Sequence, residues 1–198
     1  MKDTVKAFPA AYKKITEATK NIDFDQSSEL LVGSFLSTIS ATKPNGRFIE
    51  LGTGSGASTS WILHGMDPLS SLITIDNNEK SVSIARQCLS KDKRVNFLIG
   101  ESEELISQTE PYSIDFIFAD AWAGKYSNIE ETLSLLKPGG VYIIDDMSPG
   151  QAWSTEHIEK ATGLIQYLEN RIDFQITKMS WSSGIVLCTK KIAPKTNT

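Results

Sequence analysis

Three glycines within five residues make residues 47–58 the segment that most constrains how this chain can fold. The segment reads Arg-Phe-Ile-Glu-Leu-Gly-Thr-Gly-Ser-Gly-Ala-Ser, so a short apolar run leads into a glycine turn and then into residues that suit a helix. Glycine adopts positive φ and lets a ligand approach the backbone without a Cβ in the way. Backbone N–H groups at the start of a helix can bind a polar ligand. The pattern predicts a strand, a turn and a helix built around a nucleotide-like cofactor.

Two classes of cofactor use such a turn, and the acid before it distinguishes them. Read as Gly52-x-Gly54-x-x-Ala57, the turn fits the loose dinucleotide fingerprint. A carboxylate two residues before the first glycine would repel a pyrophosphate, whereas it would attract the sulfonium and ammonium groups of S-adenosylmethionine (SAM). With that acid included, the turn resembles the first motif of class I SAM methyltransferases, although a turn without a ligand is also possible. The resemblance implies that SAM is held by Glu50, Gly52, Gly54, Gly56 and Ser58.

Composition excludes several classes of partner. The 198 residues carry a net charge of −4 and no basic cluster, so nucleic acid is not an expected partner. No apolar run approaches the ~20 residues of a membrane helix, and the N-terminus lacks the apolar core of a signal peptide. Cys88 and Cys188 form no C-x-x-C pair and are interpreted as reduced thiols. We expect a cytoplasmic protein of one domain, 1–198.

Apolar runs and helical patterns alternate along most of the chain. Helices are expected at 10–21 and 27–40, before the first strand. Five strand-like runs, at 48–51, 72–75, 95–99, 114–119 and 141–144, are separated by helical segments at 57–64, 79–89, 103–107 and 129–136. This alternation predicts an α/β fold, with a mostly parallel sheet covered by helices on both faces.

The end of the chain has a different pattern. A helix over 156–170 precedes two strands, 174–179 and 185–189, joined by a tight polar connection, so the last of the seven strands should run antiparallel. A parallel sheet that ends in one antiparallel strand resembles the Rossmann-like fold of class I methyltransferases. We therefore expect a core over 47–190 and a helical lid over 1–46.

Acidic residues follow the strands where each strand ends, which is where α/β sheets bind ligands. Asp76 lies about twenty residues beyond the turn, as expected for a carboxylate that holds ribose hydroxyls, unless it caps the next helix. The resemblance to class I methyltransferases, in which an acid after the third strand often contacts the adenine, implies such a role for Glu101 and Ser102, with helix capping as an equal alternative.

Three further carboxylates follow the fourth and fifth strands: Asp120, Asp145 and Asp146. Adjacent strands lie about 4.8 Å apart, so these acids should converge beside the glycine turn. Crowded carboxylates repel one another unless a cation joins them, and Mg²⁺, Mn²⁺ or Ca²⁺ is the economical choice. Two alternatives are a protonated carboxyl group and pairing with Lys125.

From about residue 28 to 190, the chain resembles the cation-dependent O-methyltransferases, the family of catechol and caffeoyl-CoA O-methyltransferases. The resemblance rests on Asp120-Ala-Trp122-Ala-Gly-Lys125-Tyr126 after the fourth strand and on the acid pair after the fifth. It implies that Asp120, Asp145 and Asp146 hold the metal, with the last replacing the usual asparagine. It also gives Asp120 a place in catalysis and beside the cofactor.

One departure concerns the catalytic lysine of the catechol enzymes. Ala123 occupies its position, and Lys125 stands two residues later, where the catechol enzyme has an arginine. Lys125 is therefore expected as the general base, with a pKa lowered by burial. Alternatively, the metal alone acidifies the acceptor hydroxyl.

These observations predict a SAM-dependent O-methyltransferase of a small, catechol-like acceptor, assisted by Mg²⁺. The resemblance also makes a homodimer a possible assembly. Three alternatives stay open: a metal-independent methyltransferase of another small molecule, an NAD-dependent oxidoreductase, and a SAM-binding protein without catalytic activity.

Overall fold

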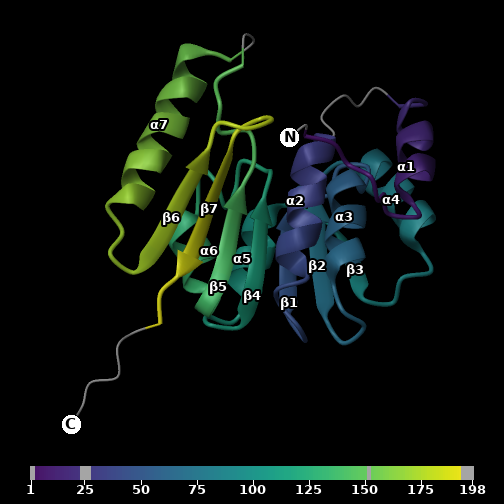
Figure 1. The fold of residues 1–198 in the computed structure, drawn as a ribbon, viewed down its shortest axis with the longest axis horizontal. Coiled ribbons are helices and arrows are strands. Elements are labelled where there is room, and N and C mark those ends of the chain that lie inside the picture. The colour runs from purple at the N-terminus through teal and green to yellow at the C-terminus, as the bar shows by residue number, and fades with distance from the viewer. Residues whose placement is uncertain (1–2, 23–27, 151–152, 193–198) are drawn as a thin grey trace.

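Seven strands form one sheet in the order β3-β2-β1-β4-β5-β7-β6 (Figure 1). The computed structural model describes residues 3–22, 28–150 and 153–192. Strands β1 to β5 pair in parallel, and β7 runs antiparallel to both β5 and β6, which confirms the prediction of one antiparallel strand. The strands are β1 (Arg47–Leu51), β2 (Ser71–Asp76), β3 (Val95–Ile99), β4 (Ile114–Ala119), β5 (Leu136–Ile144), β6 (Phe174–Met179) and β7 (Ile185–Lys190).

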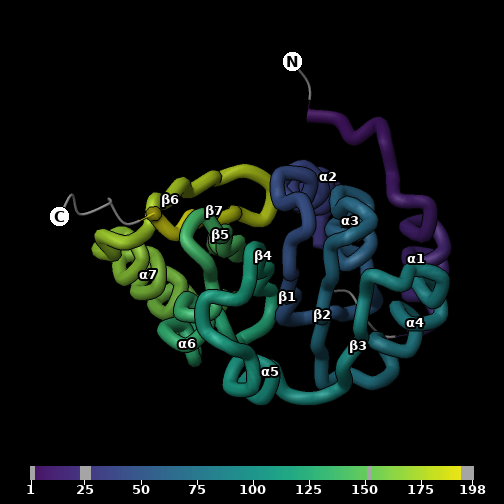
Figure 2. The backbone as a smooth tube through the Cα atoms, turned by 90° about the horizontal axis from the view of Figure 1, so that it is seen from below, coloured from purple at the N-terminus to yellow at the C-terminus, as the bar shows by residue number. Residues whose placement is uncertain are grey.

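Helices cover both faces of the sheet (Figure 2). On one face, α2 packs against α3, and α1 packs against α3 and α4; the other face is covered by α5, α6 and α7. Each face has its own apolar core, because consecutive residues of the central strands are buried alternately on the two sides. The helices are α1 (Tyr12–Thr19), α2 (Leu30–Ser40), α3 (Ala57–Gly65), α4 (Glu79–Leu89), α5 (Ser102–Gln108), α6 (Ile129–Ser134) and α7 (Thr155–Glu169).

The strand order fixes where a ligand can bind. From β1 the chain moves outward to β2 and β3, then returns across the sheet to β4 and β5 on the other side of β1. The connections on the two sides of β1 therefore diverge, and a crevice opens at the carboxyl ends of β1 and β4. Both the glycine turn and Asp120 lie at these ends.

Two boundaries differ from the sequence prediction. The helix expected over 129–136 ends at Ser134, and β5 begins at Leu136 rather than at Val141. The Lys-Pro-Gly-Gly run that resembles a turn is instead absorbed by a shift of the β4–β5 register between Ile114 and Phe116. The first two helices are also shorter than expected, and part of the predicted lid lies outside the described residues.

Candidate active site

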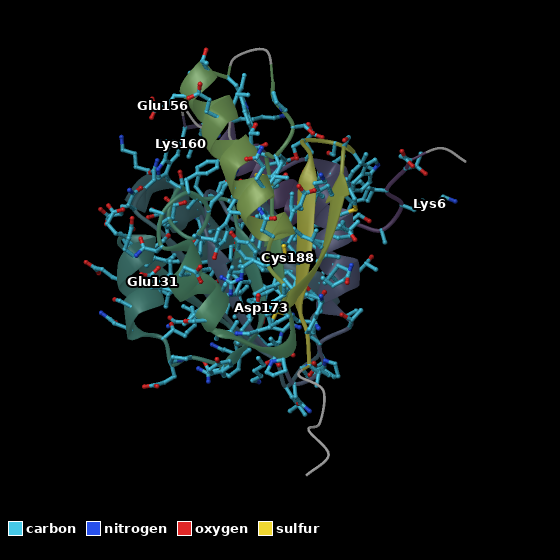
Figure 3. The ribbon with its side chains drawn as sticks, turned by 90° about the vertical axis from the view of Figure 1, so that its left-hand side faces the viewer. Lys6, Glu131, Glu156, Lys160, Asp173 and Cys188 are labelled. Carbon is cyan, nitrogen blue, oxygen red and sulfur yellow. The ribbon has the colours of Figure 1, made fainter. Side chains whose placement is uncertain are left out.

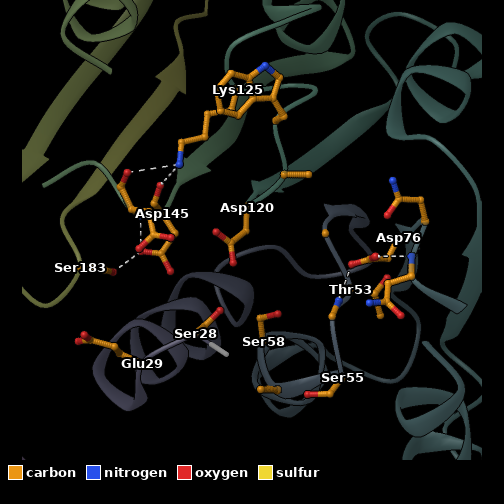
Figure 4. Close-up of a pocket in the computed structure, with 18 of the residues that line it drawn as sticks. Ser28, Glu29, Thr53, Ser55, Ser58, Asp76, Asp120, Lys125, Asp145 and Ser183 are labelled. Atoms are coloured by element: carbon orange, nitrogen blue, oxygen red, sulfur yellow. Dashed lines mark hydrogen bonds between the residues drawn. The ribbon is translucent and has the colours of Figure 1, made fainter. Parts of the chain in front are cut away.

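A cavity of about 790 Å³ opens at the carboxyl ends of β1, β2, β4 and β5 (Figure 4). Its volume falls within the range of roughly 300–1,000 Å³ that is typical of small-molecule sites. Glycine-turn residues and Asp76 form one end, and aromatic side chains with the acids after β4 and β5 form the other. Its lining comprises Ser28, Glu29, Gly52, Thr53, Gly54, Ser55, Ala57, Ser58, Asp76, Asn77, Asn78, Asp120, Ala121, Trp122, Lys125, Tyr126, Asp145, Asp146, His157 and Ser183.

The glycine turn presents its backbone to the cavity. Gly52 has φ 102°, and a Cβ there would lie 3.1 Å from the backbone of Asp120. The helix α3 then begins after Gly56, which has φ 91° and provides no side-chain cap. The hydroxyl of Ser55 is buried and has no hydrogen-bond partner among the described residues. The N–H groups of Gly52, Thr53, Gly54 and Gly56 already donate hydrogen bonds within the protein, so the hydroxyl of Ser55 is the polar group that the turn leaves for a ligand.

Glu50 lies beneath this turn and does not line the cavity wall. Its side chain is 0% exposed, and its Oε2 accepts hydrogen bonds from the hydroxyls of Thr59 (2.5 Å) and Thr74 (2.6 Å). Its Oε1 is buried without a partner among the described residues. Burial is the main cause that raises the pKa of Glu50 to about 7. If Glu50 attracts a cationic cofactor, as predicted, it therefore acts from below the glycine turn and without direct contact.

Three more of the predicted cofactor residues lie off the wall. A Cβ on Gly56 would lie 2.8 Å from the Cβ of Ala85, so this glycine permits the packing of α3 on α4. Glu101 accepts a hydrogen bond from Asn77 Nδ2 at 3.1 Å, and Ser102 is buried at the start of α5. Glu101 therefore contacts a residue of the cavity wall, Asn77, without lining the cavity itself. Asn77, which the sequence analysis missed, lines the cavity in their place.

Asp76 lies on the wall, as predicted, and joins the turn to β2. Its Oδ2 accepts a hydrogen bond from Gly54 N, and its Oδ1 accepts one from Asn78 N, each at 2.8 Å. Asn78, not Asp76, caps α4 by accepting a hydrogen bond from Ser81 N. The helix-cap alternative for Asp76 is therefore wrong.

The acids after β4 and β5 do converge on the cavity, together with Lys125. Asp145 Oδ1 accepts hydrogen bonds from Asp146 N (2.7 Å) and from the hydroxyl of Ser183. Lys125 Nζ donates to the main-chain oxygens of Asp145 (2.7 Å) and Asp146 (3.3 Å). Figure 4 shows the lysine reaching from the loop after β4 to the end of β5.

Burial and like charges perturb these groups. Burial, followed by the charges of Asp145 and Asp146, raises the pKa of Asp120 well above its ordinary value. Burial also raises the pKa of Asp145 to about 6. Burial lowers the pKa of Lys125, and the nearby carboxylates, Asp120 foremost, oppose that effect. Perturbed groups of this kind gather at functional sites.

The placement of these carboxylates does not suit a metal ion. In the part of the chain that the structure describes, no three His, Cys, Asp or Glu side chains are arranged to hold one. Asp145 already accepts two hydrogen bonds, and Asp146 is exposed, with a left-handed φ of 53°. The residues present therefore do not fit the divalent cation that the resemblance implies.

Aromatic rings line the other end of the cavity. Trp122 and Tyr126 follow β4, with their ring centroids 4.8 Å apart, and His157 of α7 lies across from them. The hydroxyl of Tyr126 lies 3.0 Å from His157 Nε2, and Trp153 stacks on the imidazole at 3.8 Å. The sequence analysis missed His157, which reaches the cavity from α7, an element distant in sequence from the glycine turn and from the loop after β4.

Ser28 and Glu29, just before α2, complete the lining. The carboxylate of Glu29 accepts a hydrogen bond from the hydroxyl of Ser182, which lies between β6 and β7. Within the described part of the predicted lid, only these two residues line the cavity. In that part, α1 packs against α3 and α4 and contributes no residue to the lining.

Solved structures of methyltransferases share this fold. An O-methyltransferase from Bacillus cereus, solved with S-adenosylhomocysteine, matches with a TM-score of 0.80 and 20% identity over 96% of this chain and 92% of that one. The O-methyltransferase TomG from Streptomyces achromogenes, solved with SAM, matches with a TM-score of 0.79 and 20% identity over 92% and 90%. At this identity the likeness shows the fold alone, the Rossmann-like methyltransferase fold predicted from the sequence.

Sequence comparison gives the family. A family described as "Methyltransferase domain" matches residues 49–147, which is half of the chain. The chain therefore belongs to this methyltransferase family. A protein of Mycobacterium avium (strain 104) with a provisional O-methyltransferase name is 30% identical over 118 residues, 57% of this chain. The match spans 53% of that relative, so the chain covers about half the length of the curated relatives it matches.

Proposed function

We propose that this protein is a SAM-dependent O-methyltransferase of a small acceptor with a planar, hydroxyl-bearing ring. The observation that carries the proposal is the division of one cavity into two ends. One end has the glycine turn, where the hydroxyl of Ser55 has no hydrogen-bond partner among the described residues, and the other has the rings of Trp122, Tyr126 and His157. Between the two ends lies Asp120, whose carboxyl group is perturbed by burial.

The glycine-turn end fits SAM. Gly52 leaves room for close approach. Glu50 Oε1 and the hydroxyl of Ser55 have no partner in the part of the chain that the structure describes, and they match a ligand with cationic and hydrogen-bonding groups. Asp76 stands where ribose hydroxyls are expected. The solved relatives from Bacillus cereus and Streptomyces achromogenes hold S-adenosylhomocysteine and SAM. When bound, SAM supplies a methyl group on a sulfonium, which an acceptor oxygen can attack.

The remaining residues would orient the acceptor and take its proton. The rings after β4 and in α7 form walls against which an aromatic acceptor packs. Asp120 is a stronger base than an ordinary carboxylate because its pKa is raised, and it is therefore a candidate to receive the hydroxyl proton. Lys125 is the base named from the sequence, but its ammonium donates hydrogen bonds to the main-chain oxygens of Asp145 and Asp146, so Asp120 is the preferred candidate. Holding the two reactants in one water-poor cavity supplies the main rate enhancement.

The divalent cation predicted at Asp120, Asp145 and Asp146 is not part of this proposal, because the carboxylates as placed do not fit one. The metal-independent alternative is therefore favoured over the cation-assisted one. An NAD-dependent oxidoreductase is disfavoured, because Glu50 lies directly beneath the turn that a pyrophosphate would occupy.

Three expectations remain predictions. They are the cytoplasmic location, the homodimer, and the division into a lid over 1–46 and a core over 47–190.

The two cysteines are free thiols, and Cys188 is buried in the sheet near α7 (Figure 3). No described helix is long and apolar enough to cross a membrane.

Calorimetry tests the cofactor first. We expect SAM and S-adenosylhomocysteine to bind in the micromolar range, about −8 kcal/mol, and NAD to show no binding. Methyl transfer from labelled SAM to a panel of phenols and catechols then tests the reaction. Binding of NAD without SAM would reject the proposal, whereas SAM binding without transfer to any acceptor would favour a non-catalytic SAM-binding protein.

A further inference from the structure

Lys125 is held at the centre of the acidic end of the cavity. Its side chain is 5% exposed, although it is a lysine that lines a cavity. Its ammonium donates hydrogen bonds to the main-chain oxygens of Asp145 and Asp146 at 2.7 and 3.3 Å. Among the described residues that line the cavity, it is the only lysine or arginine. A lysine is rarely buried unless its charge is matched.

The charge of Lys125 is matched by the three carboxylates at the strand ends. Asp120, Asp146 and Asp145 are, in that order, the anions that act most strongly on its ammonium. Asp120 experiences Asp145 and Asp146 as like charges, and Asp145 experiences Asp146 as one. Such a group is strongly destabilised when a cation is removed from it, because buried charge is then left uncompensated.

Lys125 also occupies oxygen atoms that a metal ion would need. Carboxylate and main-chain carbonyl oxygens are the ligands of Mg²⁺ and Ca²⁺. At the end of β5, the carbonyl oxygens of Asp145 and Asp146 are already bonded to the ammonium, and Asp145 Oδ1 is bonded to Asp146 N and Ser183. An ammonium and a divalent ion therefore compete for the same end of the strand.

We propose that Lys125 takes the place of a divalent cation in this protein, so that methyl transfer proceeds without a metal. This inference rests on the function proposed above. Lys125 acts as a positioning residue: its charge holds the three acids in one arrangement beside the acceptor end of the cavity. Removal of its side chain should leave the main-chain oxygens of Asp145 and Asp146 free to bind a metal ion, and so create a metal site that the wild-type protein lacks.

Manganese binding tests the proposal independently of activity. Mn²⁺ binding, followed by electron paramagnetic resonance, is compared among wild-type protein, Lys125→Ala, Lys125→Arg and the control Lys137→Ala, in each case with and without S-adenosylhomocysteine. Lys137 pairs with Asp115 at 2.7 Å and does not line the cavity. We expect weak Mn²⁺ binding by the wild type, Lys125→Arg and Lys137→Ala, and at least about tenfold tighter binding by Lys125→Ala.

Two results would overturn the proposal. One is Mn²⁺ binding by the wild type in the micromolar range that is lost in Asp145→Asn; this measurement decides even where Lys125→Ala does not fold. The other is a folded Lys125→Ala, verified by thermal melting, that gains no affinity for Mn²⁺. SAM calorimetry on the same wild-type sample separates the two hypotheses. Absence of SAM binding would reject the proposed function, and SAM-dependent transfer that is lost with EDTA would reject the role of Lys125 alone.

Discussion

His157 Nε2 lies 3.0 Å from the hydroxyl oxygen of Tyr126, and this contact joins α7 to the loop after β4. Burial lowers the pKa of His157 and is the main cause that raises the pKa of Tyr126 to about 12, so near neutral pH both groups are uncharged. Trp153 stacks on the imidazole with an interplanar angle of 13°. The pair therefore forms a fixed, neutral hydrogen-bonding wall at the end of the cavity away from the glycine turn.

Tyr126→Phe and His157→Gln should each impair use of the acceptor while leaving SAM binding unchanged. Each variant removes one partner of a half-buried hydrogen bond, which costs roughly 1–3 kcal/mol, or about ten- to hundredfold in kcat/KM for the acceptor. SAM affinity measured by calorimetry should stay within about twofold. Tyr112→Phe, on an exposed tyrosine outside the cavity, is the matched control. An equal loss of SAM affinity would assign the pair to the cofactor end instead.

Gly52→Ala should abolish SAM binding, whereas Gly139→Ala should only lower stability. Both glycines have positive φ, 102° and 80°, so either alanine costs roughly 1–2 kcal/mol of backbone strain. A Cβ on Gly139 meets nothing within 4 Å, but one on Gly52 lies 3.1 Å from the backbone of Asp120 and narrows the turn. Chemical denaturation and SAM calorimetry measure the two effects separately. Unchanged SAM affinity in Gly52→Ala would show that the cofactor does not approach this turn.

The sequence was sufficient to predict the sheet and the crevice. Apolar runs such as 116–119 are buried on both faces, and they indicated a parallel sheet covered by helices. A run that ends in an acid also places that acid at the crevice when its strand lies next to β1, which is why Asp76 and Asp120 were predicted correctly as lining residues. The extension of β5 back to Leu136 was missed because Pro138 and the glycines after it are typical of a turn.

The local sequence pattern could not predict how deeply a side chain lies below the cavity floor, or how far a strand end lies from the cavity. The side chains of successive strand residues point to opposite faces, so the position of Glu50 below the floor depends on the register of β1 against β2 and β4. Glu101 follows the edge strand β3, and only the strand order shows how far that edge lies from the crevice. His157 reaches the cavity from α7, which is distant in sequence from the other lining residues. These contacts arise from tertiary packing.

Asp76→Asn should weaken SAM binding without unfolding the turn. Asparagine keeps one oxygen, so it can accept only one of the two 2.8 Å hydrogen bonds from Gly54 N and Asn78 N, and it loses the charge that binds ribose hydroxyls most strongly. We expect a loss of affinity of about tenfold, near 1.4 kcal/mol, with a modest decrease in the melting temperature. Asp76→Ala should lose both the affinity and some stability. The assignment of the ribose to Asp76 would be wrong if Asp76→Asn bound SAM as well as the wild type.

Glu50→Gln should stabilise the protein without SAM at alkaline pH, although it removes a residue of the cofactor site. The pKa of Glu50 is raised by burial from 4.5 to about 7 in the folded protein. Because the folded-state pKa is the higher one, the stability that Glu50 contributes is fully present below pH 4.5 and is lost as pH rises through about 7. The loss approaches roughly 3 kcal/mol at pH 8. Glutamine does not ionise, so Glu50→Gln does not lose this stability as the pH rises.

Denaturant unfolding of the wild type and Glu50→Gln at pH 5 and pH 8 measures this difference. The advantage of the variant should grow between the two pH values by about 2–3 kcal/mol, while Glu131→Gln, on the exposed surface of α6, should follow the wild type. At pH 8, saturating SAM should make the wild type more stable than Glu50→Gln. The reason is that a cationic ligand stabilises the ionised carboxylate and has no such interaction with an amide. A pH-independent difference would mean that Glu50 stays charged in the folded protein. In that case burial would not be the dominant influence on this carboxyl group, and a buried partner for its Oε1 would have to exist.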